Sequence, residues 1–134
     1  MKSRSGFVLA VFLVTVLLAA GQASAKTTWL CSLSTAVACD EDGTIGPPDL
    51  GGLERPTFLR VDVDSRKVTM LGPESRRGEV TIIDTVFEGD GIWVFTGVEA
   101  ARAWSLVISK DGHLTLSVAT DGAVWSAFGN ALRE

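Results

Sequence analysis

Apolar and polar residues alternate along most of the chain beyond residue 57. Leu59, Val61 and Val63 alternate with charged residues, and similar runs rich in Val, Ile, Thr, Phe and Trp recur toward the C-terminus. A period of two places successive side chains on opposite faces of a strand, so the pattern predicts strands with one buried face. About eight short strands are predicted, at residues 28–33, 59–64, 68–70, 79–88, 92–98, 103–109, 114–119 and 124–128.

The spacing of these runs predicts an all-β fold. Short strands joined by tight turns form an antiparallel meander that folds as a small barrel or a sandwich. Asp-Gly pairs separate several runs, and Asp111-Gly112 suits a type I′ hairpin turn, which needs positive φ. The adjacent apolar residues Ile82 and Ile83 predict either a bulge or burial on both faces of their strand.

The first 25 residues have the three parts of a secretory signal peptide. Lys2 and Arg4 supply a positive start, an apolar run covers residues 7–20, and Ala23 and Ala25 match the A-x-A cleavage pattern. This run of 14 residues is shorter than the roughly 20 that span a bilayer as a helix. We therefore expect a signal-peptide helix that is cleaved, no stable membrane anchor after cleavage, and a periplasmic or secreted product.

Cleavage after residue 25 would leave residues 26–134, enough for a single all-β domain. The chain has 12 basic and 16 acidic residues; loss of Lys2 and Arg4 changes its formal net charge from −4 to −6. Nucleic acids and anionic lipid surfaces bind clustered Lys and Arg. The charge therefore disfavours a nucleic-acid partner and favours a cationic one.

Cys31 and Cys39 are the two cysteines of the chain. Export would take them to an oxidising compartment, where thiols that lie close together normally pair. We predict one disulfide between them, closing a short loop.

Residues 34–55 do not alternate and are predicted to form a long irregular loop. The loop contains the acidic run Asp40-Glu41-Asp42 together with a Pro pair and a Gly pair. Long loops of this kind often carry binding sites. The acidic run resembles the opening of a calcium loop, but Gly51 stands where the bidentate Glu is expected, so a solvated loop is favoured and no metal site is predicted.

No set of residues indicates catalysis. His113 is the sole histidine and follows a hairpin turn, where solvent reaches it. The sequence has no G-x-S-x-G elbow and no glycine-rich phosphate loop. Folding can bring distant carboxylates together, which leaves an acid-based enzyme open. No catalytic residue and no cofactor is predicted.

Four tryptophans and no tyrosine occur in the chain. Trp104 shares a strand face with the apolar residues that follow it, which indicates core packing. Trp93, Phe95 and Trp125 fit either core packing or the lining of a cavity or exposed apolar stripe. Arg102 would place a cation at the mouth of such a cavity, or is an ordinary strand-end charge.

The segment R-A-W-S-L from Arg102, the Asp-Gly hairpin after it and the terminal W-S-A-F-G resemble small exported bacterial β-proteins of unassigned function. In size, export and β content the chain is also similar to the periplasmic inhibitors of c-type lysozyme, small barrels with a disulfide. That similarity implies a protein partner. The chain departs from these inhibitors in having no tyrosine and in having its cysteines close together near the N-terminus.

These observations predict an exported, non-enzymatic binding protein whose contact surface is the loop 34–55 and the barrel rim. A cationic protein such as a lysozyme-like hydrolase is the expected partner. The alternatives are a carrier that holds a small apolar ligand in its barrel, and an envelope enzyme that uses carboxylates. The candidate binding residues are Asp40, Glu41, Asp42, Trp93, Phe95, Arg102 and Trp125.

Overall fold

The computed structural model describes residues 26–48 and 56–134, and strands make up most of them. The predicted signal peptide (residues 1–25) and residues 49–55 of the predicted loop lie outside the described residues. The all-β prediction is confirmed. The elements are β1 (Thr28–Asp40), β2 (Ile45–Gly46), β3 (Thr57–Asp62), β4 (Lys67–Gly72), the 3₁₀ turn η1 (Glu74–Arg76), β5 (Val80–Ile82), β6 (Thr85–Gly89), β7 (Ile92–Glu99), β8 (Arg102–Ser109), β9 (His113–Thr120) and β10 (Ala123–Arg133).

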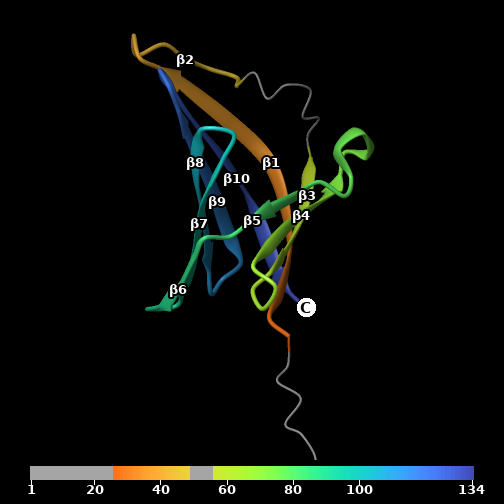
Figure 1. The fold of residues 1–134 in the computed structure, drawn as a ribbon. Coiled ribbons are helices and arrows are strands. Elements are labelled where there is room, and N and C mark those ends of the chain that lie inside the picture. The colour runs from red at the N-terminus through yellow and green to blue at the C-terminus, as the bar shows by residue number, and fades with distance from the viewer. Residues whose placement is uncertain (1–25, 49–55) are drawn as a thin grey trace, which may run out of the picture.

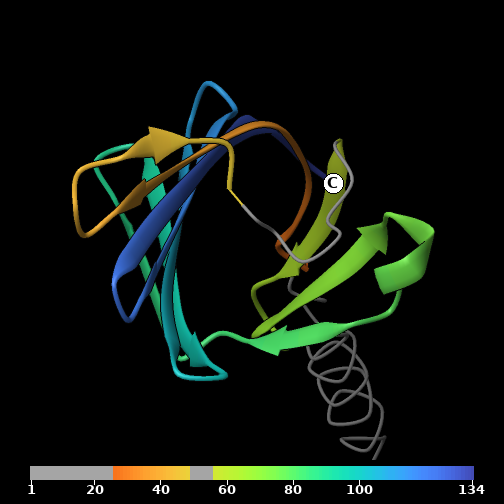
Figure 2. The ribbon, with the colours of Figure 1, turned by 90° about the horizontal axis from the view of Figure 1, so that it is seen from above.

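The strands form one antiparallel sheet that curls into a half-barrel (Figure 1 and Figure 2). The strand order is β5-β4-β3-β1-β10-β9-β8-β7-β6, and the short β2 pairs with β1. Hairpins join most neighbouring strands, as the predicted meander requires, and β1 inserts between β3 and β10. The two edge strands of the sheet, β5 and β6, follow each other in the chain.

The chain crosses from one sheet edge to the other at the adjacent residues Ile82 and Ile83. The backbone N–H of Ile83 donates to the carbonyl of Arg66 at 3.0 Å, and that of Asp84 donates to the carbonyl of Thr96 at 2.9 Å. Ile83 is buried and Ile82 is exposed. The structure therefore replaces the expected bulge with a break, because the strand changes partners from β4 to β7 at this point.

Alternate side chains point into the half-barrel, as the sequence pattern predicts. On β8, Trp104, Leu106 and Ile108 face inward and are buried. Inward residues from seven strands or their junctions meet in one core. The core comprises Trp29, Cys31, Leu33, Leu59, Val61, Ile83, Phe95, Trp104, Leu106, Ile108, Leu114, Val118 and Ala127.

Strand β1 contains a β-bulge, which interrupts the apolar–polar alternation by which a strand is identified in the sequence. The register shifts between Leu33 and Thr35, which leaves Ser34 as an extra residue. The backbone of β10 comes so close here that a Cβ on Gly129 would lie 1.7 Å from the carbonyl oxygen of Ser32. Glycine is therefore required at position 129.

The predicted loop 34–55 is wrong for most of its described residues. β1 continues beyond the bulge and pairs with β10 as far as Asp40, and residues 45–46 form β2. The expectation failed because the extra residue shifts the alternation by one position, which breaks the period of two. Only a four-residue turn at 41–44 separates β1 from β2.

The predicted disulfide does not form in this structure, in which Cys31 and Cys39 are both free. They lie eight positions apart on one extended strand, a span of about 26 Å at roughly 3.3 Å per residue. A disulfide needs Cα atoms within about 7 Å of each other. The bulge at Ser34 also turns Cys39 to the exposed outer face, whereas Cys31 is buried in the core.

Two of the hairpin turns differ in backbone geometry. Asp90 and Gly91 have φ values of 53° and 77°, which is the type I′ geometry, between β6 and β7. Between β8 and β9, Gly112 has a positive φ of 83° and Asp111 does not. The type I′ turn predicted at Asp111-Gly112 is therefore wrong; a wider turn forms instead, closed by a 3.0 Å hydrogen bond from Gly112 N–H to Ser109.

Candidate functional site

A pocket of about 790 Å³ lies inside the half-barrel. Strands β1, β3, β4, β5 and β7 to β10 contribute its lining, together with η1. Its wall is apolar because each strand turns its apolar positions inward. The apolar lining comprises Leu33, Ala36, Ala38, Pro48, Leu59, Val68, Met70, Ala100, Trp104, Leu106, Leu116, Val118, Ala123, Trp125 and Ala127.

Three aromatic rings, those of Trp29, Trp93 and Phe95, pack together in another part of the half-barrel and do not line the pocket. Phe95 is fully buried, and its ring stacks on Trp93 with centroids 6.1 Å apart. Trp93 meets Trp29 edge-on at 6.3 Å. The structure therefore places Trp93 and Phe95, two of the candidate binding residues, in the packed part of the interior.

Two tryptophans do line the pocket, Trp104 on β8 and Trp125 on β10. Trp104 is 9% exposed and packs over Gly97 of β7, its cross-strand partner. Its indole Nε1 is buried and has no hydrogen-bond partner among the described residues. Trp125 is half-buried, between Ala38 and Val118 on the neighbouring strands. These rings give the pocket broad apolar surfaces.

The rim of the pocket is a row of residues set by strand register. Asp40 pairs with Ala123 and Ala123 with Thr120, while Arg102 on β8 pairs with Glu99 on β7. All five line the pocket. Residues far apart in the sequence therefore form one continuous edge.

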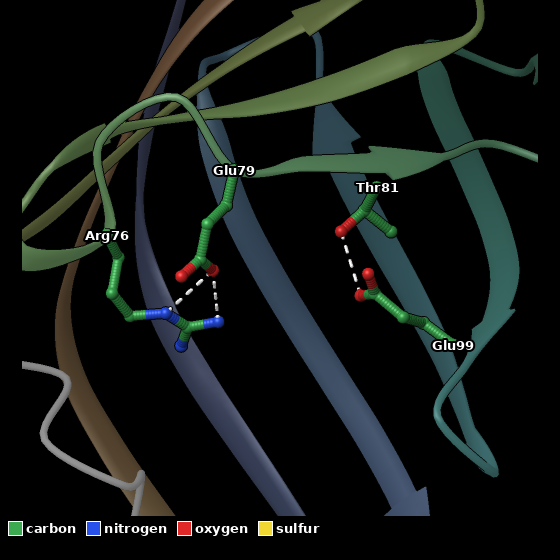
Figure 3. Close-up of polar contacts among 4 residues, drawn as sticks. All are labelled: Arg76, Glu79, Thr81 and Glu99. Atoms are coloured by element: carbon green, nitrogen blue, oxygen red, sulfur yellow. Dashed lines mark hydrogen bonds and ion pairs between the residues drawn. The ribbon is translucent and has the colours of Figure 1, made fainter.

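Side chains from η1, β5 and β7 form the polar side of this rim (Figure 3). Arg76 donates from two nitrogens to Oε2 of Glu79, at 2.8 and 2.6 Å. The Arg76 hydrogen bond lowers the pKa of Glu79 below its ordinary value. The hydroxyl of Thr81 donates to Oε2 of Glu99 at 2.8 Å. Figure 3 shows the two contacts beside each other.

Arg102 is an exposed cation on the rim, on the same face of β8 as Trp104. In residues 26–48 and 56–134 the ion pairs are Arg60 with Glu134, Arg76 with Glu79 and Arg77 with Glu74, so Arg102 takes part in none of them. Its guanidinium is free to meet a solute at the mouth of the pocket.

The three acidic candidate residues, Asp40, Glu41 and Asp42, do not lie on the same surface. Asp40 lines the pocket, whereas Glu41 and Asp42 occupy the exposed turn before β2 and do not. A hydrogen bond from Thr44 lowers the pKa of Asp42, which shows that its carboxylate stabilises the turn. The three acids therefore do not act as one patch on the pocket.

Sequence reasoning missed Arg76, Glu79, Thr81 and Glu99. Arg76, Glu79 and Thr81 lie outside any clear apolar–polar alternation. Their positions near one another depend on the path of the chain from η1 into β5. A signal for Glu99 was present: the segment E-A-A-R is a two-residue hairpin, and the residues at its base face the same side of the sheet.

The described residues around the pocket combine an apolar wall with charged and hydroxyl groups at the rim. No group of three His, Cys, Asp or Glu residues in the described part of the chain has the arrangement of a metal site. His113 is exposed at the start of β9 and does not line the pocket. The part of the chain that the structure describes contains no helix with the length and apolar character to cross a membrane.

Comparisons of the chain with protein-family models, with curated proteins and with solved structures find no match.

Proposed function

We propose that this protein binds a small apolar molecule in the half-barrel pocket and carries it outside the cytoplasm. One observation supports this above all: the side chains of the described residues leave a largely apolar space of about 790 Å³ in the interior. Pockets that hold small ligands have volumes of roughly 300–1,000 Å³, with apolar walls and a few polar groups.

The packing on either side of the pocket supports the same proposal. Residues such as Phe95 and Ile108 fill one part of the interior completely. Small residues, Ala36, Ala38 and Ala127, occur where the lining faces the pocket. Larger side chains at these positions would fill the space and stabilise the core, so the small residues preserve room for a ligand.

The alternative is a protein-binding surface made of the loop 34–55 and the barrel rim, and the described residues give it less support. Within that segment, residues 34–40 belong to β1 and 45–46 to β2. Among its described residues, the exposed acidic turn is small compared with a stable protein interface, which buries about 800 Å² on each partner. The lysozyme-inhibitor relation stays a prediction.

Ligand binding can be tested by intrinsic fluorescence, because Trp104 and Trp125 line the pocket and the chain has no tyrosine. We expect a panel of medium-chain apolar compounds and hydrophobic dyes to shift or quench the emission, with Kd values confirmed by calorimetry. Absence of binding across the panel would refute the proposal.

A pair of neighbouring substitutions on β1 locates the bound ligand. Ala38 lines the pocket, whereas Val37 lies on the outer face. Ala38→Phe should fill the pocket and weaken binding by about tenfold or more, the scale set by roughly 1.4 kcal/mol. Val37→Phe adds an aromatic ring outside and should leave the Kd unchanged. Equal effects of the two variants would place the ligand elsewhere.

Export is the second part of the proposal, and it rests on the signal-peptide pattern at residues 1–25. We expect the protein recovered from the envelope of its own host to begin at Lys26. N-terminal sequencing or intact-mass measurement of that material checks the cleavage site. Native mass spectrometry of the same sample would reveal a ligand that copurifies.

A further inference from the structure

Arg102 stands where the apolar wall of the pocket meets solvent. It follows Glu99 around the β7–β8 turn and precedes Trp104 and Leu106, which lie deeper on the same face of β8. On the other side it is next to Thr120, and Ala123 follows on β10. Neither neighbour carries a charge. The guanidinium of Arg102 therefore has uncharged rim residues on its β9 side. The apolar wall of the pocket lies below it.

The nearest acid along the rim is held away from Arg102. Glu99 is the direct cross-strand partner of Arg102, yet no ion pair joins the two side chains. The carboxylate of Glu99 instead accepts the Thr81 hydroxyl at 2.8 Å (Figure 3). The second basic residue of the lining, Arg76, is bound to Glu79. Among the described residues that line the pocket, Arg102 is therefore the cation whose guanidinium takes part in no ion pair.

We propose that the ligand is an amphipathic monocarboxylate, with its carboxylate on Arg102 and its apolar chain against Trp104 and Leu106. This inference rests on the proposed function. Guanidinium and carboxylate match geometrically and form two parallel hydrogen bonds, which makes the pair stronger than a single neutral contact. The apolar wall below Arg102 buries the chain of the same molecule.

The acidic residues of the rim limit the charge of the headgroup that the pocket accepts. Asp40 lies at the β1 end of the rim row and Glu99 at the β7 end, with Arg102 between them. These carboxylates repel a headgroup with two or more negative charges and tolerate a single one paired with Arg102. The rim therefore favours a monocarboxylate over a phosphate monoester or a dicarboxylate.

Decanoate, 1-decanol and decyl phosphate share one apolar chain and separate the headgroup from it. We expect the protein to bind decanoate about tenfold more tightly than the other two, by calorimetry and tryptophan fluorescence. Arg102→Gln should reduce decanoate affinity about tenfold and change decanol affinity less than twofold. Arg77→Gln, which alters an exposed arginine outside the lining, is the control and should change neither.

Two further variants test the rim geometry. Thr81→Val removes the hydroxyl that holds Glu99, so Glu99 is free to pair with Arg102 and decanoate affinity should fall while decanol affinity does not. Asp40→Asn removes a rim charge and should strengthen decanoate binding. Circular dichroism spectra and unfolding midpoints confirm that each variant is folded.

The outcomes separate the two proposals. Equal affinity for decanoate and decanol, or unchanged decanoate binding in Arg102→Gln, overturns the carboxylate assignment and leaves an apolar carrier. Preferential binding of decyl phosphate also overturns it. No binding of any of the three compounds, with a negative ligand panel, refutes the carrier function itself.

Discussion

The indole of Trp104 lies against the backbone of Gly97, its partner on the neighbouring strand. A Cβ added to Gly97 would come within 2.6 Å of Cζ2 and 2.7 Å of Nε1 of that indole. Real Cβ atoms do not approach other atoms so closely, so the ring takes this position only because residue 97 lacks a side chain. One glycine on β7 thereby sets the position of a pocket wall on β8.

Gly97→Ala should destabilise the fold and displace Trp104. Overpacking of a core costs about 1–3 kcal/mol, and the displaced ring should also alter ligand affinity and tryptophan emission. Gly46→Ala is the control, because a Cβ there has nothing within 4 Å; its effect should stay within about 0.5 kcal/mol. Denaturant unfolding measures both. Equal stability of the two variants would contradict this packing.

The sheet-edge crossing predicts opposite results at two adjacent isoleucines. Ile83 is 1% exposed and Ile82 is 56% exposed. Ile83→Ala should cost about 2–5 kcal/mol, the usual range for a buried aliphatic side chain. Ile82→Ala should change stability by about 0.5 kcal/mol. Urea unfolding measures the free energy of unfolding of both variants, compared at equal m-value. The difference tests whether Ile83, and not Ile82, packs in the core at the crossing.

The β7–β8 turn contains two alanines in a conformation that favours glycine and asparagine. Ala100 and Ala101 have φ values of 47° and 60°, the type I′ geometry, at the pocket rim. Left-handed backbone costs an alanine roughly 1–2 kcal/mol. The double change Ala100→Asn and Ala101→Gly should therefore raise the free energy of unfolding by about 1 kcal/mol.

The β6–β7 turn provides the reverse experiment. It has the same geometry with Asp90 and Gly91, so Asp90→Ala with Gly91→Ala should destabilise by a similar amount. Thermal unfolding checks both directions. A loss of stability at both turns would show that factors other than backbone conformation dominate.

The positions of the cysteines predict one reactive thiol in the folded protein. Cys39 is exposed and Cys31 is buried, so a thiol reagent should modify one site rapidly and two after denaturation. Cys39→Ser should abolish the rapid reaction and Cys31→Ser should keep it. A purified monomer with no titratable thiol and a mass lower than that of the reduced chain by two hydrogen atoms would instead indicate a disulfide between Cys31 and Cys39.

Burial also gives Cys31 an effect on stability at high pH. It raises the pKa of this thiol from about 9 to about 12. Between these values the unfolded chain loses a proton that the folded chain keeps, so stability is complete below pH 9 and falls as the pH rises toward 12.

The slope of this loss is at most about 1.4 kcal/mol per pH unit. Denaturant unfolding from pH 8 to 10.5 measures it. Cys31→Val should flatten this component of the profile, whereas Cys39→Ser should retain it. Parallel profiles for wild type and Cys31→Val would rule out a contribution from Cys31.

Much of the C-terminal half was predictable because its signals are local. Residues 114–118 alternate strictly between apolar and polar, and residues 104–109 do so apart from the apolar Val107, so each run indicates which side of its strand is buried. Arg102 and Trp104 could therefore be assigned to one face of their strand. A place for Trp125 in a cavity lining was an open alternative, since core packing explains the same pattern.

Local sequence patterns are enough to predict short antiparallel strands with an apolar inner face, because a period of two and the turn residues act between near neighbours. The bulge at Ser34, the separation of the cysteines, the packing of Phe95 and the place of Trp125 at the pocket follow from the folded arrangement of the strands. Strand register and sheet curvature determine these features. They depend on contacts between distant segments, such as β1 with β10 and Glu99 with Thr81, which no local pattern encodes.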